Sequence, residues 1–365
     1  MAMAMKDGSD GTSMRLADRR NPRSSPVTLC IVGMLLLGPI LSSNSQSPGV
    51  SAPKLPTTIR VALQWKPQSQ FAGFYMAKAK DLYRAAGLDV RLHHADATHN
   101  SLDMLRDGGA ELATSFLADA LIAACKNPAS AGTALPGIVQ VAQVVRRSNL
   151  MLVAWKDLGI HSAADLDGRR VSYWQGGFSS SYEAFFHARG IRPLPIPQYY
   201  SVNLFLSRGV AACAAMEYNE YDRIRQAGID EDQLSVFLMR DSGLGLPEDG
   251  IYAAAGWMAH NRETALAFRK ATMAGWEYAR GHVEETIDVV LAEAKKSGVA
   301  ANRSHERWML GHILASIFVK GESPERIGAL DAVDFEKTVD LLRRDGLLDR
   351  APSLSAFAPM QESAR

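Results

Sequence analysis

Three aromatic side chains near residue 70 are candidates for holding a flat ring. Trp65 ends a predicted strand, and Phe71 and Tyr75 follow it closely. A heterocycle that stacks on such rings gains about 0.5–1.5 kcal/mol beyond the burial of its area. Trp65 also shares a strand face with Ile59 and Leu63, so a place in the core is the structural alternative.

A glycine-rich turn between Trp174 and Tyr182 leads into a predicted helix. Free N–H groups at a helix start can bind an anionic or carbonyl oxygen, and glycine lets the backbone approach closely. Trp174, Gly177 and Phe178 are therefore candidate contacts. The plain alternative is a strand–helix turn that a serine caps.

Two acidic segments supply hydrogen-bond groups. Glu217, Tyr218, Asn219 and Glu220 follow a predicted strand and suit ring N–H and amino groups, because charge-assisted bonds contribute roughly 1.5–3 kcal/mol each. A solvent-facing helix start is the alternative for some of them. Glu248 and Asp249 either contact a ligand or brace a connection between domains.

The sequence offers no pattern for catalysis. A Ser/His/Asp or Cys/His set requires a free choice of partners, and no phosphate-binding GxxxxGK[ST] occurs. His93, His94 and His99 fit a solvated strand–loop junction better than a metal site. We therefore expect no enzyme, no cofactor and no metal.

The three cysteines show no zinc-ligand spacing. Cys30 lies in a segment that we expect to be removed. Cys125 and Cys213 are either buried free thiols or a disulfide, and their positions in the sequence do not decide between the two.

Strand-like and helix-like segments alternate from residue 57. The predicted strands are 58–65, 88–93, 111–114, 138–145, 150–155, 170–174, 197–201, 211–216, 234–239 and 251–256. The predicted helices are 74–86, 101–106, 117–124, 162–166, 180–189, 204–209 and 218–226. After Asn261, a candidate N-cap, the chain is predicted to be almost wholly helical to residue 348.

Repeated strand–helix units predict mostly parallel sheets covered by helices, and two such runs predict two α/β lobes. Ligands of open α/β sheets lie beyond the carboxyl ends of the strands, so two facing lobes would form a cleft. The strand-end residues are therefore the candidate contacts: Trp65, Ser115, 174–178, 217–219, Glu248 and Asp249.

The first 45 residues have the pattern of a secretory signal peptide. Basic residues precede an apolar run from Val27 to Leu41, which is shorter than the roughly twenty residues that span a bilayer. An uncleaved N-terminal anchor is the alternative, and both place the protein outside the cytoplasm. A twin-arginine signal at Arg19-Arg20 and lipidation at Cys30 fit less well. Residues 46–56 have the composition of a linker.

The composition is that of a globular protein. Hydrophobic residues make up 47% of the 365 residues and charged residues 22%, with a formal net charge of +1. This balance gives no global field that would attract nucleic acid or an anionic membrane surface.

Several separated segments resemble ABC-transporter substrate-binding proteins. The branch is the one that takes thiamine-pyrimidine precursors, related to binders of alkanesulfonates, nitrate and taurine. The resemblance covers roughly residues 57 to 350. It rests on Leu63–Pro67, Phe71–Tyr75, Gly87–Val90, Met216–Glu220 and Leu246–Tyr252.

The resemblance implies a type 2 periplasmic-binding-protein fold, in which two lobes close on a small flat nitrogen heterocycle. Two crossing strands, near residues 146–156 and 240–252, would join the lobes. Lobe 1 would comprise 57–145 and 250–350 with the C-terminal helices, lobe 2 would comprise 146–249, and 351–365 would be a tail. It also implies a periplasmic protein, expected to be a monomer, whose partners are an inner-membrane permease and its ATPase.

Eukaryotic pyrimidine synthases of the same branch are the enzyme alternative. Their opening motif has Asp, Asn and a consumed His where this chain has Gln64, Gln68 and Phe71, and their cysteine-rich iron motif is absent. A sulfonate- or nitrate-type anion, or a flavin, remains an alternative ligand.

Overall fold

The computed structural model describes residues 55–95, 100–126, 137–175, 179–321, 323 and 326–361. The expected signal peptide and residues 46–54 of the expected linker lie outside these ranges. None of the helices in the described ranges is long and apolar enough to cross a membrane. The described strands form two five-stranded sheets. We call the sheet that contains β1 (Thr57–Leu63), together with its helices, lobe 1, and the other sheet with its helices lobe 2.

Lobe 1 is built on a sheet with strand order β2-β1-β3-β10-β4. Its strands are β1 (Thr57–Leu63), β2 (Leu88–His94), β3 (Leu112–Phe116), β4 (Ile138–Gln143) and β10 (Asp249–Ala254). Strand β1 pairs in parallel with β2 and β3, whereas β10 pairs antiparallel with β3 and β4. Strands β1 to β4 therefore share one direction, and β10 runs against them.

Lobe 2 repeats this plan with the order β7-β6-β8-β5-β9. Its strands are β5 (Leu150–Trp155), β6 (Arg170–Tyr173), β7 (Leu194–Pro197), β8 (Ala212–Met216) and β9 (Leu234–Leu238). Strand β6 pairs in parallel with β7 and β8, and β5 pairs antiparallel with β8 and β9. In lobe 2, β5 therefore runs in the direction opposite to the other four strands.

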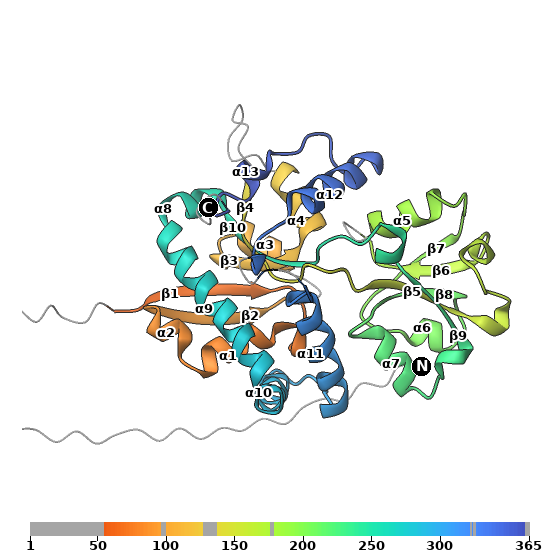
Figure 1. Ribbon diagram of the computed structural model, residues 1–365, viewed down its shortest axis with the longest axis horizontal. Coiled ribbons are helices and arrows are strands. Elements are labelled where there is room, and N and C mark those ends of the chain that lie inside the picture. Colours follow the sequence, from red (N-terminus) through yellow and green to blue (C-terminus); the bar gives the residue numbers. More distant parts are fainter. Residues whose placement is uncertain are drawn as a thin grey trace, which may run out of the picture. The chain divides into compact units, whose positions relative to one another are not determined.

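The mostly parallel sheets expected from the sequence are confirmed, apart from β10 and β5. The chain crosses from β4 to β5 through residues 144–149 and returns from β9 to β10 through residues 239–248 (Figure 1). The carboxyl ends of the parallel strands face the opposite lobe, so a strand that arrives from that lobe starts at this edge and runs away from it. The crossings therefore explain the two antiparallel strands.

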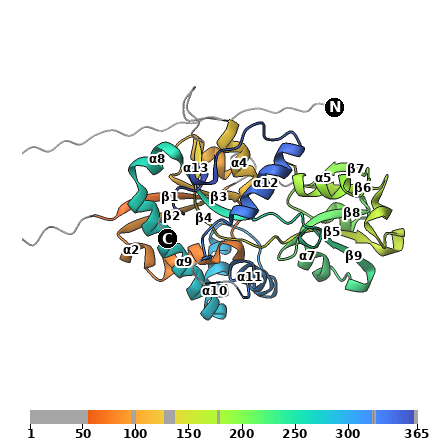
Figure 2. The ribbon, with the colours of Figure 1, turned by 45° about the horizontal axis from the view of Figure 1, so that its top comes forward.

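Helices cover both faces of the lobe 1 sheet (Figures 1 and 2). On one face lie α1 (Ala72–Ala79), α2 (Leu82–Ala85), α9 (Arg262–Gly281), α10 (Val283–Lys296) and α11 (Arg303–Ile317). On the other lie α3 (Ser101–Arg106), α4 (Leu117–Lys126), α12 (Ala332–Arg344) and α13 (Leu354–Phe357). A short helix, α8 (Ala255–His260), follows β10 directly.

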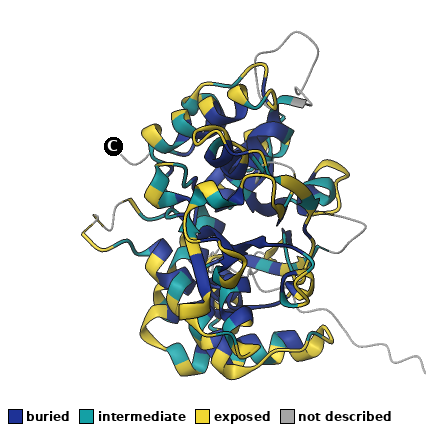
Figure 3. Ribbon diagram, turned by 90° about the vertical axis from the view of Figure 1, so that its right-hand side faces the viewer, coloured by how far each residue is buried: buried dark blue, intermediate teal, exposed yellow. Residues whose placement is uncertain are grey.

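The helices of lobe 2 are shorter. They are α5 (Ser179–His187) on one side of the sheet, and α6 (Asn203–Leu206) and α7 (Glu220–Gln226) on the other. Along β5, Leu150, Leu152 and Ala154 join one apolar cluster, whereas Met151 and Val153 join another, as the period of a strand requires. Both faces of this strand are therefore buried, as Figure 3 shows for the sheet interiors.

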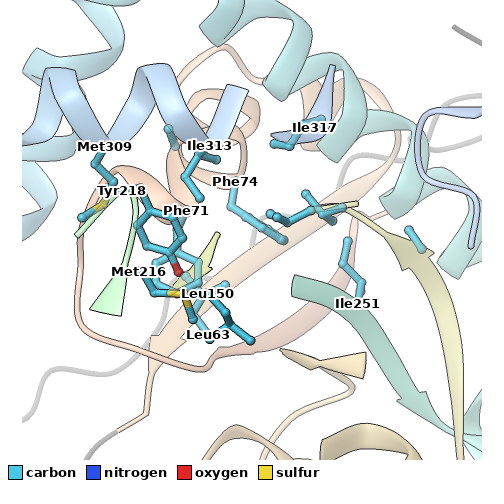
Figure 4. Close-up of a cluster of buried hydrophobic side chains, with 14 of the residues drawn as sticks. Leu63, Phe71, Phe74, Leu150, Met216, Tyr218, Ile251, Met309, Ile313 and Ile317 are labelled. Carbon is cyan, nitrogen blue, oxygen red and sulfur yellow. The ribbon is translucent and has the colours of Figure 1, made fainter. Parts of the chain in front are cut away.

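The largest apolar cluster contains residues of both lobes. Ile59, Val61 and Leu63 of β1 belong to it, which confirms their predicted shared face. Figure 4 shows Leu63 and Phe71 of lobe 1 drawn with Met216 and Tyr218 of lobe 2 and with three residues of α11. The two lobes therefore meet in apolar packing beside the crossings.

Helices α1 and α9 approach closely because each has a glycine at the contact. A Cβ on Gly73 would lie 2.3 Å from the Trp276 ring, and one on Gly275 would lie 2.1 Å from the Gly73 carbonyl oxygen. The indole of Trp276 is fully buried as a result. These glycines set the distance between the helices that cover β1 and β2.

Hydrogen bonds tie the two crossings to each other. Glu248 on the second crossing accepts from the backbone N–H of Asn149 at 2.5 Å and from its side-chain amide at 2.9 Å. The Gln143 amide donates to the carbonyl oxygens of Val145 and Glu248 at 2.9 and 3.0 Å. Ser316, near the end of α11, donates to the Asn149 side chain at 3.0 Å. The end of α11 is thereby fixed to the crossings.

Two sequence expectations need correction, and a third is confirmed in position alone. The helix predicted over 74–86 is split, because Asp81 adopts a left-handed conformation (φ 54°) between α1 and α2. The strand predicted over 197–201 lies earlier, as β7, whose prolines are tolerated because the strand is at the edge of its sheet. Asn261 stands at the N-cap of α9, but its side chain donates to the Trp257 carbonyl and makes no cap bond.

Candidate ligand-binding site

A cavity of about 430 Å³ lies between the lobes, at the carboxyl ends of β1 and β8. Its volume lies within the range of small-molecule sites. Lobe 1 contributes Gln64, Trp65, Gln68, Gln70 and Phe116. Lobe 2 contributes Trp174, Gln175, Pro197, Gln198, Tyr199, Tyr200, Met216, Tyr218, Asn219 and Glu220.

Aromatic rings from the two lobes meet at this cavity. The centroids of Trp65 and Tyr200 are 4.4 Å apart, with planes tilted by 44°. The Lys66 ammonium lies 4.8 Å from the centre of the Tyr200 ring, and the Trp174 indole N–H donates to the Tyr199 carbonyl at 3.3 Å. Because the Trp65 and Tyr200 rings touch, they join the two lobes on this side of the cavity, and their remaining faces are apolar.

Tyr218 lies deep in the site, with 2% of its surface exposed. Burial raises its pKa well above the ordinary value, and the Asp249 and Glu248 carboxyls raise this pKa further. Its phenol therefore stays neutral and can donate or accept one hydrogen bond at the cavity wall.

Gln64 presents an unused hydrogen-bond acceptor. Its amide nitrogen donates to Asp249 at 2.9 Å, which fixes the orientation of the side chain. Its amide oxygen is buried and has no partner among the described residues. A buried acceptor without a partner costs about 1–3 kcal/mol. Because this oxygen has less than 1 Å² of accessible surface, a ligand could bond to it only after the side chain or its neighbours move.

Asp249 stands behind the wall and orients two glutamines. Its second oxygen accepts from Gln70 at 2.8 Å, and the Gln70 oxygen in turn accepts from Gln68 at 2.7 Å. Burial raises the pKa of Asp249 to about 7, although the bonds from Gln70 and Gln64 act in the opposite direction. This chain of amides holds the lobe 1 side of the cavity rigid.

Glu220 brings a carboxylate to the lobe 2 side of the cavity. It is 3% exposed and accepts from the Met216 backbone N–H at 2.9 Å and from the Asn219 amide at 2.7 Å. Burial raises the pKa of Glu220 above its ordinary value. Each carboxylate oxygen retains acceptor capacity that a ligand amino group can use.

The charge of the lining differs from that of an anion site. Among its described residues the lining includes one carboxylate and several amides, but no Lys, Arg or His. Lys66 lies outside this lining, over Tyr200. The described wall therefore favours a ligand that donates hydrogen bonds over one that only accepts them.

A second cavity, of about 610 Å³, lies within lobe 1. It shares Gln64, Trp65 and Phe116 with the first cavity and is also lined by Ser115. Ser115, which was predicted from its place at a strand end, therefore lines this second cavity and not the first. The shared residues form the wall between the two cavities.

The other predicted contacts do not all lie at this cavity. Trp65, Trp174, Tyr218 and Asn219 line the first cavity together, whereas Asp249 lies behind it. Gly177 and Phe178 lie outside the described residues. Lining a cavity is not ligand contact, so the site stays a prediction.

Phe71 and Tyr75 are enclosed in the core, with 0% and 2% of their surfaces exposed. His94 packs against both rings. Its Nε2 lies 3.1 Å from the Tyr75 hydroxyl oxygen, and its Nδ1 lies 2.6 Å from the Trp65 carbonyl oxygen. Burial lowers the pKa of His94. His94 is therefore a support for the Trp65 backbone and not a solvated residue, in contrast to the expectation for the strand–loop junction.

Glu217 and Glu248 belong to the connection between the lobes. The Arg240 guanidinium donates to Glu217 at 2.6 and 3.3 Å. Burial raises the pKa of Glu248 to about 8, and its bonds to Asn149 and Ser148 act in the opposite direction. Of the two roles left open for Glu248, the geometry matches the brace.

Neither a metal cluster nor a disulfide is found in the described part of the chain. Cys213 is buried in the apolar cluster of lobe 2, and Cys125 packs on a cluster of lobe 1. Both thiols are free, so the free-thiol alternative is the one that the structure contains.

Sequence reasoning missed several residues of the lining: Gln64, Gln68, Gln70, Phe116, Pro197, Gln198, Tyr199, Tyr200 and Met216. Tyr199 and Tyr200 closely follow β7, so the strand-end rule that selected Trp65 would have found them if the end of β7 had been placed correctly. Gln68 and Gln70 reach the wall through a short 3-10 helix, Ser69–Phe71, for which the sequence has no strong signal.

The sequence of this chain is similar to those of known proteins. A family model described as NMT1/THI5 like matches residues 68–286. A formylaminopyrimidine-binding protein of Halalkalibacterium halodurans is 23% identical over 318 residues, which cover 84% of this chain and 91% of that protein.

Solved structures share the fold. The alkanesulfonate-binding protein SsuA from Xanthomonas axonopodis pv. citri, bound to MOPS, superposes with a TM-score of 0.60 at 17% identity, covering 82% of this chain and 98% of that one. The periplasmic aliphatic sulphonate binding protein SsuA from Escherichia coli gives 0.59 at 16% identity, covering 83% and 97%. These likenesses confirm the two-lobed periplasmic-binding-protein fold.

Proposed function

This chain belongs to the NMT1/THI5-like family, and from that premise we propose that it is the substrate-binding protein of an ABC importer. Its ligand would be a small flat nitrogen heterocycle with amino or ring N–H groups, of the thiamine pyrimidine-precursor type. The similarity to a formylaminopyrimidine-binding protein supports this ligand class.

The observation that carries the ligand class is the pairing of acceptors with aromatic rings in one cavity. Glu220 offers a carboxylate from lobe 2. Gln64 of lobe 1 holds a buried oxygen that has no partner among the described residues and that a ligand would reach after a movement of the side chain. Trp65 and Tyr200 supply the ring faces. A ligand that is flat and carries N–H donors satisfies all of these groups at once.

A sulfonate or nitrate fits the described wall less well. Such anions only accept hydrogen bonds, so the Gln64 oxygen would stay without a partner and the Glu220 carboxylate would repel the charge. The likeness to sulfonate-binding proteins concerns the fold at 16–17% identity. This likeness is in keeping with a role in transport, but it does not favour a sulfonate as the ligand.

The enzyme alternative lacks its reacting group. Phe71 stands where the pyrimidine synthases have the histidine that they consume, and its ring is wholly enclosed in the core. We therefore propose a binding protein that acts outside the cytoplasm and delivers its ligand to a permease and its ATPase. Ligand capture would proceed by closure of the lobes about residues 144–149 and 239–248.

Calorimetric titration of the purified protein tests this proposal. We expect saturable one-to-one binding of formylaminopyrimidine or hydroxymethylpyrimidine, and no heat with taurine, methanesulfonate or nitrate. Binding of the anions alone would overturn the ligand class. Scattering measured with and without saturating formylaminopyrimidine tests closure, because an unchanged radius of gyration would contradict capture by lobe movement.

A further inference from the structure

Hydrogen bonds between side-chain amides connect Asp249 to the cavity wall. Asp249 is the first residue of β10 and is 4% exposed. Its Oδ1 accepts from Gln64 Nε2 at 2.9 Å, and its Oδ2 accepts from Gln70 Nε2 at 2.8 Å. The Gln70 side-chain oxygen accepts from Gln68 Nε2 at 2.7 Å, and Gln68 lines the cavity. We call Asp249, Gln70 and Gln68, in this order, the amide relay.

The carboxylate of Asp249 dictates which way each amide of the relay points. An ionised carboxylate only accepts hydrogen bonds, whereas an amide has a donor end and an acceptor end. Gln70 must therefore turn its nitrogen to Asp249 and its oxygen to Gln68. Gln68 in turn must direct its nitrogen to Gln70, which leaves its own oxygen at the far end. Reversing either amide would place oxygen against oxygen or N–H against N–H, and both arrangements are unfavourable.

The far end of the relay is open to the cavity. Gln68 is 5% exposed, and none of the described residues bonds to its side-chain oxygen. This oxygen is also not among the described atoms that are wholly buried without a partner, so part of its surface is accessible. The Gln64 oxygen, by contrast, is one of those buried atoms. Of these two glutamines, Gln68 is therefore the one whose oxygen a ligand can reach without a rearrangement.

We propose that Asp249 is a positioning residue that determines ligand specificity, because it makes the Gln68 end of the relay an acceptor. A ligand that donates an amino or ring N–H at this point is favoured. One that presents a carbonyl oxygen there is disfavoured, since two acceptors would face each other. The inference rests on the proposed function, whose ligand donates hydrogen bonds, and it names the residue that sets this preference in lobe 1.

An amide at position 249 would reverse the relay. Its side chain has one oxygen and one NH₂ group, so it cannot accept from both Gln64 and Gln70. One of these glutamines must then turn its oxygen toward position 249. A turned Gln64 would bury its NH₂ group where the present oxygen has no partner among the described residues, which leaves two donors unpaired. Gln70 is therefore the one that turns, and Gln68 turns with it and brings its nitrogen to the cavity.

Thermal unfolding at pH 8.5 tests the relay without a ligand. Burial raises the pKa of Asp249 to about 7, so this pH measures the carboxylate form. In Gln68→Glu the introduced carboxylate cannot donate to Gln70, which then meets an acceptor at both ends. We expect the melting temperature to fall by at least about 3 °C. The same substitution in an Asp249→Asn background should cost less than half as much, because Gln70 can turn and satisfy both neighbours.

Gln70→Met separates the relay from simple repulsion between two carboxylates. Repulsion acts through space and would persist after this substitution, whereas the relay needs the Gln70 amide. With Gln70→Met present, the relief that Asp249→Asn gives to Gln68→Glu should largely disappear. The proposal is overturned if Asp249→Asn gives no relief while Gln70 is present, or if it gives equal relief after Gln70→Met.

Calorimetric titration at the same pH tests specificity. The probes are hydroxymethylpyrimidine with its ring amino group and an analogue that carries a carbonyl oxygen in place of that amino group. We expect the unmodified protein to prefer the amino compound, and the ratio of the two dissociation constants to fall at least about fivefold in Asp249→Asn. Glu248→Gln, which changes the neighbouring buried acid that bonds Asn149 and not the relay, should keep the ratio.

The outcomes distinguish this role of Asp249 from the proposed function. If neither pyrimidine binds the unmodified protein, the ligand class fails, and the unfolding measurements still decide whether Asp249 directs Gln68. If both pyrimidines bind and Asp249→Asn leaves their ratio unchanged, Asp249 does not determine specificity and the proposal is overturned, while the binding function stands.

Discussion

The carboxylate of Glu248 receives both the backbone N–H and the side-chain amide of Asn149, so one buried acid on the second crossing holds the first crossing. The same Asn149 side chain accepts from Ser316 of α11. The hinge between the lobes is therefore a bonded unit, and its strength depends on the protonation of a carboxyl group with no direct access to solvent.

Stability should depend on pH through Glu248 and its neighbour Asp249. Burial raises the pKa of these carboxyls to about 8 and about 7. Because the folded pKa values lie above the unfolded ones, their stabilising contribution is complete below about pH 4 and is lost as the pH rises through about 7–8. Urea unfolding should show a free energy that falls from pH 5 to pH 8, by at most about 1.4 kcal/mol per pH unit for each carboxyl.

Glu248→Gln and Asp249→Asn test the assignment of that slope. Each amide stays neutral at every pH, so each variant should lose its share of the slope. The exposed Glu231→Gln serves as control and should unfold with an unchanged slope. A slope that neither buried substitution alters would show that other groups cause it.

Trp65→Ala should weaken ligand binding without unfolding the protein. Trp65 is only partly buried and touches Tyr200 of the other lobe, so its removal deletes a ring face and a cross-lobe contact. Stacking on an aromatic side chain contributes about 1–3 kcal/mol per base, which corresponds to about a 5- to 150-fold loss of affinity. Calorimetry with formylaminopyrimidine measures the loss. Tyr278→Ala, on the distant α9, is the control that should bind normally.

Glu220→Gln should reduce affinity for ligands that donate an amino group. The substitution keeps an oxygen for the Met216 N–H but removes the charge that strengthens a bond to the ligand. A charge-assisted bond contributes about 1.5–3 kcal/mol, so we expect about a 10- to 150-fold loss at pH 7.5. Unchanged affinity, with Glu231→Gln run beside it, would place the ligand away from this carboxylate.

Gly275→Ala and Gly311→Ala should have opposite effects on stability. A methyl group at Gly275 would lie 2.1 Å from the Gly73 carbonyl oxygen, and overpacking of this kind costs about 1–3 kcal/mol. A methyl group at Gly311, inside α11, would have nothing within 4 Å, so alanine there should add about 0.5–1 kcal/mol through backbone entropy. Thermal unfolding of the two variants measures both signs. Equal destabilisation would contradict close packing of α1 on α9.

Most strands could be predicted because their signal is local. The run Leu150–Trp155 is apolar at every position, and both of its faces prove to be buried. The two-lobed fold followed from the repeated strand–helix units and from the family resemblance. The split of the helix at Asp81 could not be predicted in the same way, because a single left-handed residue leaves the apolar pattern unchanged.

The sequence could predict a site residue only where a side chain able to stack or to form hydrogen bonds stands at the end of a strand. Trp65 and Tyr218 line the cavity as strand-end reasoning expected. Glu217 was expected there too, but Arg240 lies beside it from a segment farther along the chain, and that proximity exists only in the fold. The contact of His305 on α11 with Asp222 and Asn219 is likewise invisible in the sequence, since it joins residues of separate lobes.

The reversed strand β10 also decides the order in which the chain can complete its sheets. Among the described strands, β4 pairs with β10 alone, and the residues of β10 follow the whole of lobe 2 in the sequence. The sheet of lobe 2, by contrast, is one continuous stretch from Leu150 to Leu238. A chain that emerges from its N-terminus therefore completes its second lobe before its first. Until residue 254 arrives, β4 has an open edge that a chaperone could cover.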